Sequence, residues 1–166
     1  FAFFNSSDAF LLLLLKSKGL SDIQMIGVYI FYNLVYALLS MPIGILADKI
    51  GMKKIMVFGL ICFSIVYLGM AFSLEFWHFG LLFFIYGIYA ASIEGVSKAL
   101  ITNISDKSNT ATAIGFYTSF LSVFTMLASS IGGVLFMINP VFMFIFSGIG
   151  VALVALYFFI INIKEI

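Results

Sequence analysis

The chain has 166 residues, of which 64% are hydrophobic and 9% are charged, and its mean hydropathy is +1.24. A soluble domain carries about a quarter charged residues, so this composition excludes a soluble globular protein. The net charge of +1 gives no basic field for nucleic acid, and the single cysteine, Cys62, excludes a disulfide framework.

Long apolar runs divide the chain into predicted membrane-spanning helices. The runs are too continuous for barrel strands, in which apolar and polar residues alternate, and about 20 helical residues cross a hydrocarbon layer of about 30 Å. The sequence therefore predicts an all-α fold, a single domain over 1–166 with six transmembrane helices. The predicted spans are about 1–17, 22–47, 53–73, 77–101, 109–138 and 140–163. Because the first apolar run is short for a span, we expect the chain to be a fragment.

The lysines predict the orientation of these spans. With six spans, the odd and even loops lie on opposite sides of the membrane. One side carries six lysines and the other carries Lys16 and Lys18. By the positive-inside rule the lysine-rich side is cytoplasmic. We therefore expect the 48–54 loop and the C-terminus to be cytoplasmic, in a plasma or bacterial inner membrane. The six lysines are Lys49, Lys53, Lys54, Lys98, Lys107 and Lys164.

The first predicted span contains a carboxyl group, Asp8. It precedes Lys16 by eight residues, about 12 Å along a helix, which places it near the middle of the membrane. Asn5, at i−3, would share its helix face and could bind the carboxyl group or a ligand. Two interpretations stay open: a protonatable site for coupling or substrate binding, and a buried carboxyl group satisfied by polar neighbours.

Two polar side chains, Asn33 and Tyr36, lie near the middle of the second span, ahead of Pro42. They are candidates to line a substrate cavity. Hydrogen bonding between helices is an equally open interpretation.

The segment that joins the second and third spans reads Gly-Ile-Leu-Ala-Asp-Lys-Ile-Gly-Met-Lys-Lys, residues 44–54. We expect Gly44 to let two helices approach closely, Gly51 to adopt a positive φ, and Asp48 to cap a helix start. The lysines suit an anionic membrane surface. This segment, the signature loop, resembles the loop G-x-L-x-D-[RK]-x-G-x-[RK]-[RK] of the major facilitator superfamily. The matching residues are Gly44, Asp48, Lys49, Gly51, Lys53 and Lys54.

The fourth span begins with Trp77 and His78, which suit the outer membrane interface. Further along, Glu94 and Lys98 are spaced i, i+4, which predicts an ion pair along one helix face. Proton transfer by Glu94, a second cavity candidate, is the alternative.

The fifth span is rich in hydroxyl groups. Such groups either join helices or bond to the carbonyl four residues earlier, so none is predicted to be a ligand. The residues are Tyr117, Thr118, Ser119, Ser122, Thr125, Ser129 and Ser130.

Two further segments, 5–12 and 94–100, are similar to the seventh and tenth helices of bacterial facilitator proteins. The resemblance implies the carboxy-terminal six-helix half, helices seven to twelve. It implies a secondary active transporter that moves a small solute by alternating access, with an amino-terminal half as its partner. Asp8 becomes the first candidate for proton coupling. No cofactor and no metal ion are implied.

Two other classes of function compete with a transporter. A non-transporting membrane subunit, or a degenerate half, would have the same spans. An intramembrane enzyme would need paired catalytic groups, but His78 is the single histidine and no H-E-x-x-H pattern occurs. We therefore do not expect an enzyme.

Overall fold

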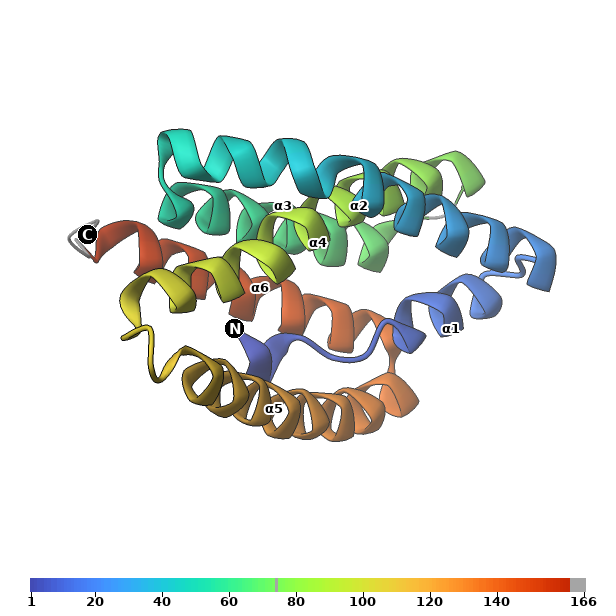
Figure 1. The fold of residues 1–166 in the computed structure, drawn as a ribbon. Coiled ribbons are helices and arrows are strands. Elements are labelled where there is room, and N and C mark those ends of the chain that lie inside the picture. Colours follow the sequence, from blue (N-terminus) through green and yellow to red (C-terminus); the bar gives the residue numbers. More distant parts are fainter. Residues whose placement is uncertain (74, 162–166) are drawn as a thin grey trace.

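The computed structural model describes residues 1–73 and 75–161 as an all-α bundle, which confirms the predicted fold class (Figure 1). The helices are α1 (Ala9–Ser17), α2 (Asp22–Ile50), α3 (Met52–Phe72), α4 (Phe76–Ile104), α5 (Thr110–Ile138) and α6 (Pro140–Ile160), preceded by a 3-10 turn, η1 (Ala2–Phe4). The five helices from α2 to α6 are long and apolar enough to cross a membrane.

The first predicted span is not one continuous helix, which corrects the predicted span 1–17. The 3-10 turn η1 ends at Phe4 with Asn5 as its C-cap, and α1 begins at Ala9 with Asp8 as its N-cap. The residues between are polar, and their side chains compete with a helical backbone for hydrogen bonds. The Ser7 hydroxyl oxygen accepts a bond from the Ala9 N–H at 3.3 Å, and the Ser7 N–H donates to Ser129 Oγ at 3.1 Å.

The other boundaries differ from the predictions by a few residues. Helix α2 continues to Ile50 and α4 to Ile104, three residues beyond their predicted ends. A helix can continue through polar residues into the headgroup region. The apolar run, from which the span is predicted, then ends before the helix does. Pro42 lies inside α2 and does not end it. The predicted end of the last span at 163, and Lys164, fall outside the described residues.

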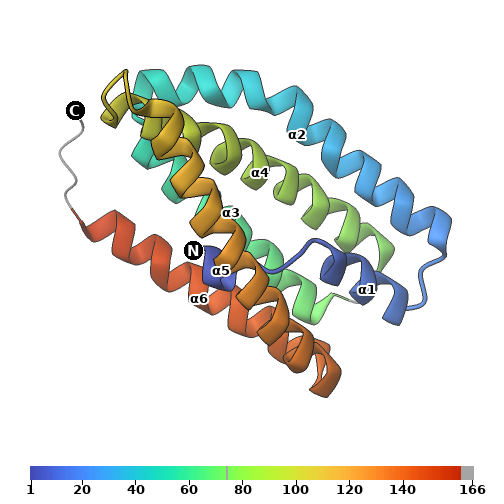
Figure 2. The same cartoon turned by 60° about the horizontal axis from the view of Figure 1, so that its bottom comes forward.

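The core of the bundle lies between α3, α4 and α6, and its largest fully buried side chains are Tyr67, Phe63, Phe79, Phe83 and Phe144. Helix α2 packs mainly on α4, and α5 packs on α6 and η1. Both α2 and α5 bury few side chains, so they flank a largely uncovered face (Figure 2). The α2–α3 turn, the α4–α5 loop and the end of α6 lie at one end of the bundle, the left in Figure 1.

Gly87 allows α2 and α4 to pack closely. A Cβ atom at this position would lie 2.7 Å from Val35 Cγ1 and 3.0 Å from the Tyr32 carbonyl oxygen, which belongs to the backbone and cannot rotate away. We therefore expect Gly87→Ala to lower the free energy of unfolding by about 1–3 kcal/mol, measured on the intact protein in detergent. Gly80→Ala on the same helix is the matched control, since a Cβ there meets nothing within 4 Å. Equal stability of the two variants would contradict this packing.

Candidate functional site

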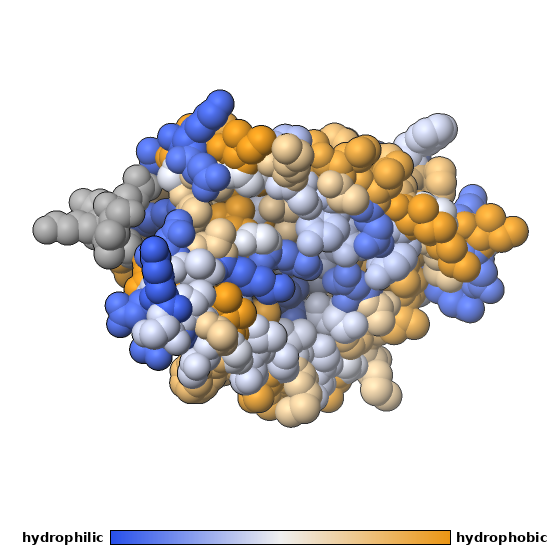
Figure 3. Space-filling view, viewed as in Figure 1, coloured by the Kyte–Doolittle hydropathy of each residue, from blue (hydrophilic) through white to orange (hydrophobic). Residues whose placement is uncertain are grey.

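The face between α2 and α5 is polar at its centre. Hydrophilic side chains gather in a hollow across the middle of the molecule, between apolar surfaces (Figure 3). Two carboxyl groups come from the elements that lie between α2 and α5 in Figure 1. Asp8, at the start of α1, is half-buried, and Glu94, on α4, is exposed in this chain.

Asp8 is held by two tyrosines from different helices. The Tyr86 hydroxyl of α4 donates to Asp8 Oδ1 at 2.6 Å, and the Tyr32 hydroxyl of α2 donates to Asp8 Oδ2 at 3.2 Å. Both tyrosines are nearly buried, 2% and 7% exposed. Hydrogen bonds to an ionised carboxylate are stronger than those between neutral groups, so this arrangement ties α2 and α4 to the break in the first helix. The two tyrosines are the polar neighbours that a structural role of Asp8 requires. The interpretation of Asp8 as a protonatable site stays open beside it.

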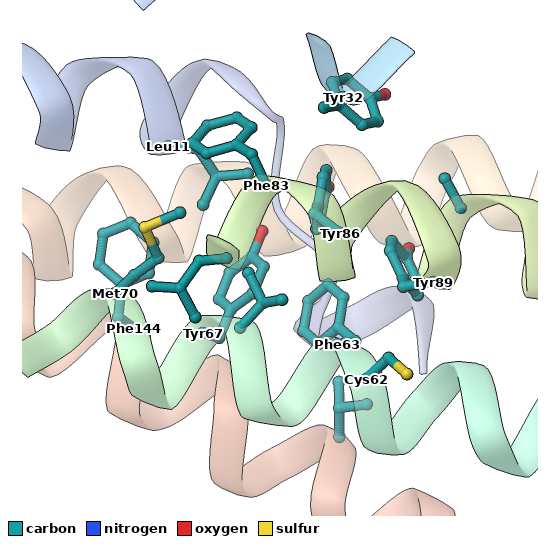
Figure 4. Packing of buried hydrophobic residues seen from close by; sticks show 14 of the residues in the cluster. Leu11, Tyr32, Cys62, Phe63, Tyr67, Met70, Phe83, Tyr86, Tyr89 and Phe144 are labelled. Carbon is teal, nitrogen blue, oxygen red and sulfur yellow. The ribbon is translucent and has the colours of Figure 1, made fainter. Parts of the chain in front are cut away.

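These tyrosines belong to a larger aromatic cluster (Figure 4). The rings of Tyr32 and Tyr86 are 5.1 Å apart, as are those of Tyr86 and Tyr89. Behind them Phe63 stacks on Tyr67 at 4.0 Å and meets Tyr89 edge-on at 5.0 Å. Closely packed rings hold the two hydroxyl groups on Asp8 in fixed directions.

The second carboxyl group pairs across helices, not along its own. The Tyr36 hydroxyl of α2 donates to Glu94 Oε2 at 3.0 Å. The predicted ion pair between Glu94 and Lys98 is wrong: in the described part of the chain the one ion pair joins Lys16 and Asp22, at 3.3 Å. The structure thus brings Tyr36 and Glu94 together.

The two predicted asparagines do not join either carboxyl group. Asn5 lies at the end of η1, outside α1, so it does not share a helix face with Asp8 as predicted. The Asn33 amide donates to the Tyr29 carbonyl oxygen on its own helix at 2.8 Å. This bond satisfies one donor of Asn33 locally and forms no link between helices.

The hydroxyl groups of α5 mostly bond within their own helix, as one of the two interpretations predicts. Thr118, Ser119, Ser122 and Ser130 each donate to the carbonyl oxygen four residues earlier, at 2.8–2.9 Å. Ser129 differs, since its oxygen receives the Ser7 N–H. It therefore joins α5 to the break before α1.

The signature loop is a turn at one residue, Gly51, between two helices. Its φ of +103° confirms the predicted positive φ. Asp48 lies inside α2 and makes no cap, since the N-cap of α3 is Gly51 itself. Gly44 does not bring two described helices together; it lines a groove of about 190 Å³ between α2 and α4. The Lys53 ammonium group donates to the carbonyl oxygen of Ile161, so it caps the C-terminal end of α6.

The sequence analysis missed the partners of Asp8. Tyr32 and Tyr86 lie in apolar spans, where they resemble ordinary core aromatics. A signal was present, because a tyrosine buried in lipid or protein needs a partner for its hydroxyl group. The sequence could not tell which carboxyl group would supply it.

A bundle of membrane-length helices with a polar, carboxyl-bearing face is typical of membrane transporters. Residues 1–165 match the family model described as Major Facilitator Superfamily. The chain belongs to this superfamily. It is 36% identical over 137 residues to an uncharacterized MFS-type transporter of Methanocaldococcus jannaschii, a match over 82% of this chain and 34% of the relative. The chain thus spans about a third of the length of that relative. The superfamily consists of transporters and not enzymes, as the sequence analysis expects.

Proposed function

We propose that this chain is the carboxy-terminal half of a secondary active transporter that moves a small solute by alternating access. Asp8 is the group whose protonation couples solute movement to an ion gradient. The observation that carries this proposal is the position of Asp8, half-buried at the polar face and bound by tyrosines from two helices. A change in its charge alters the bonds that hold α2 and α4 to the first helix.

The uncovered face supplies the second argument. Helices α2 and α5 bury little within this chain, although both are long enough to cross a membrane. In lipid, a polar hollow between them needs a protein wall on its open side. An amino-terminal six-helix half fits this requirement, and the relative is about three times as long as the matched region. Tyr36 and Glu94 would then lie on the wall of the cavity between the halves.

The orientation follows from the lysines at one end of the bundle. Lys49, Lys53 and Lys54 flank the α2–α3 turn, and Lys107 lies in the α4–α5 loop at the same end. We place this end in the cytoplasm, in a plasma or bacterial inner membrane. The signature loop then lies where it can bias the inward-facing and outward-facing states.

Uptake into liposomes tests this proposal. A thermal-shift screen on the intact protein first identifies a solute that stabilises it, because a ligand that binds the folded state raises the apparent stability. The labelled solute is then offered to protein-containing liposomes under an imposed proton gradient. We expect accumulation above the external concentration, and collapse of that accumulation when the gradient is dissipated. If every stabilising solute stays outside, the protein is a non-transporting subunit and the proposal is wrong.

A further inference from the structure

Two hydroxyl groups beside Asp8 are buried without a hydrogen-bond partner. They are Ser6 Oγ, in the break before α1, and Tyr67 Oη, on α3. Ser6 is 3% exposed and Tyr67 is fully buried. The Tyr67 hydroxyl lies next to Ser6 and Tyr86, yet makes no hydrogen bond of normal geometry with either. Buried hydroxyl groups nearly always have a partner, and a bound group at this position would supply one to both.

The surroundings of these hydroxyl groups supply further oxygen atoms. Tyr86 donates its proton to Asp8, so its oxygen can act only as an acceptor toward any further group. The break also exposes the backbone, because the carbonyl groups of residues 3–6 accept no main-chain hydrogen bond in the described part of the chain. Interrupted helices in transporters commonly place such carbonyl groups around a coupling ion. The site therefore offers carboxylate and hydroxyl oxygens, with unbonded carbonyl groups in the same break of the chain.

The charge at this position favours a cation over water. The titratable groups that face Asp8 are Tyr32 from α2, Tyr67 from α3, and Tyr86 and Tyr89 from α4, with Glu94 as the next carboxyl group on α4. From α5 the contact to the break is the hydroxyl of Ser129. No lysine or histidine pairs with Asp8 among the described residues. Water would satisfy the hydroxyl groups but leave the carboxylate charge in the membrane uncompensated.

We propose that the break before α1 is a site for a monovalent cation, with Asp8, Ser6 and Tyr67 as side-chain ligands. One carboxylate with neutral oxygens matches a single positive charge. The close burial of Ser6 and Tyr67 favours a small alkali ion over a large one. The proposal rests on the proposed function in one respect, since it names the ion that the same carboxyl group would couple to solute movement.

The test measures Na⁺-dependent stability of the intact protein in detergent, in choline chloride at constant ionic strength. We expect NaCl to raise the unfolding temperature saturably and KCl to do so weakly. Asp8→Asn should abolish the stabilisation by Na⁺.

Variants of the two hydroxyl ligands test the site itself. Ser6→Ala and Tyr67→Phe should each weaken Na⁺ binding by about tenfold, the factor expected for one lost oxygen contact. Tyr89→Phe is the matched control, because Tyr89 lies in the same aromatic cluster and makes no hydrogen bond to Asp8 in the structure. It should keep the Na⁺ response of the parent protein.

Three results would overturn the cation site. They are a Na⁺ response no different from that of choline, a response that persists in Asp8→Asn, and equal effects of Tyr67→Phe and Tyr89→Phe. Each of these results can be told apart from a failure of the protein to transport a solute. Solute accumulation driven by protons, in a protein that ignores Na⁺, would leave the transporter intact and remove only this inference.

Discussion

Replacing Asp8 with Asn should reduce solute uptake driven by a proton gradient to the level of empty liposomes. Asparagine has nearly the same shape but cannot gain and lose a proton in the physiological range. One of its two polar atoms is an amide nitrogen, which donates and does not accept, so asparagine cannot accept one tyrosine hydroxyl at each of its two atoms as Asp8 does. We therefore expect a loss of stability of about 1–3 kcal/mol, a cost that still leaves the bundle folded. Uptake and thermal unfolding are measured on the same purified, intact protein.

Asp22→Asn is the matched control for this prediction. Asp22 is an exposed carboxyl group that pairs with Lys16 at 3.3 Å, in the connection between α1 and α2. Its removal should leave uptake unchanged, because surface ion pairs contribute at most about 1 kcal/mol. Full proton-driven uptake by Asp8→Asn would show that Asp8 has a purely structural role, and the coupling role assigned to it would be wrong.

Gly51→Ala should have the next largest effect. Gly51 has φ +103° and ψ 130°, a conformation that a residue with a Cβ atom adopts at a cost of about 1–3 kcal/mol. It is both the C-cap of α2 and the N-cap of α3, so no neighbouring turn residue can absorb the strain. We expect a lower unfolding temperature and a smaller yield of folded protein.

Gly44→Ala separates the effect of this turn from a general effect of the signature loop. A Cβ atom at Gly44 meets nothing within 4 Å in this chain, and the residue is helical. Alanine there should be neutral, or stabilising by up to about 1 kcal/mol. If instead Gly51→Ala is as stable as the parent protein and Gly44→Ala is damaging, the contact that matters is one that Gly44 makes outside this chain, as with the proposed amino-terminal half.

The features that the sequence predicted are those set by local chemistry. Continuous apolar runs located the long helices, since the hydrocarbon layer fixes both their length and their polarity. The positive φ of Gly51 followed from a glycine in the short polar segment between two predicted spans. For the α5 hydroxyl groups the sequence offered two partners, neighbouring helices or their own carbonyl groups, and four of them bond to their own helix.

The features that the sequence did not predict depend on which helices pack together. Asp8 bonds to Tyr32, 24 positions away, and to Tyr86, 78 positions away, and Glu94 bonds to Tyr36, 58 positions away. The sequence of one helix identifies only residues about one turn apart as neighbours. It therefore predicts an ion pair between Glu94 and Lys98. The break at residues 5–8 was missed for a related reason. Its polar residues are stabilised by α5 through Ser129, a contact that the local sequence does not contain.

Alternating access can be tested by comparing the accessibility of two positions on α2 in the intact protein. Tyr29 and Gly44 lie 15 residues apart, about 22 Å along the helix, on opposite sides of the level of Tyr36. Single cysteines at these positions are labelled in liposomes with a membrane-impermeant maleimide, against the low background expected of the buried Cys62. Lys107→Cys, in an exposed loop, is the reference for general reactivity.

Alternating access predicts opposite changes at the two positions. When the solute or the ion gradient is applied, the labelling rate should rise at one cysteine and fall at the other, while Lys107→Cys stays constant. Asp8→Asn should remove the response to the proton gradient. Parallel changes at both positions, or no change with a solute that demonstrably binds, would contradict a transporter that opens to one side of the membrane at a time.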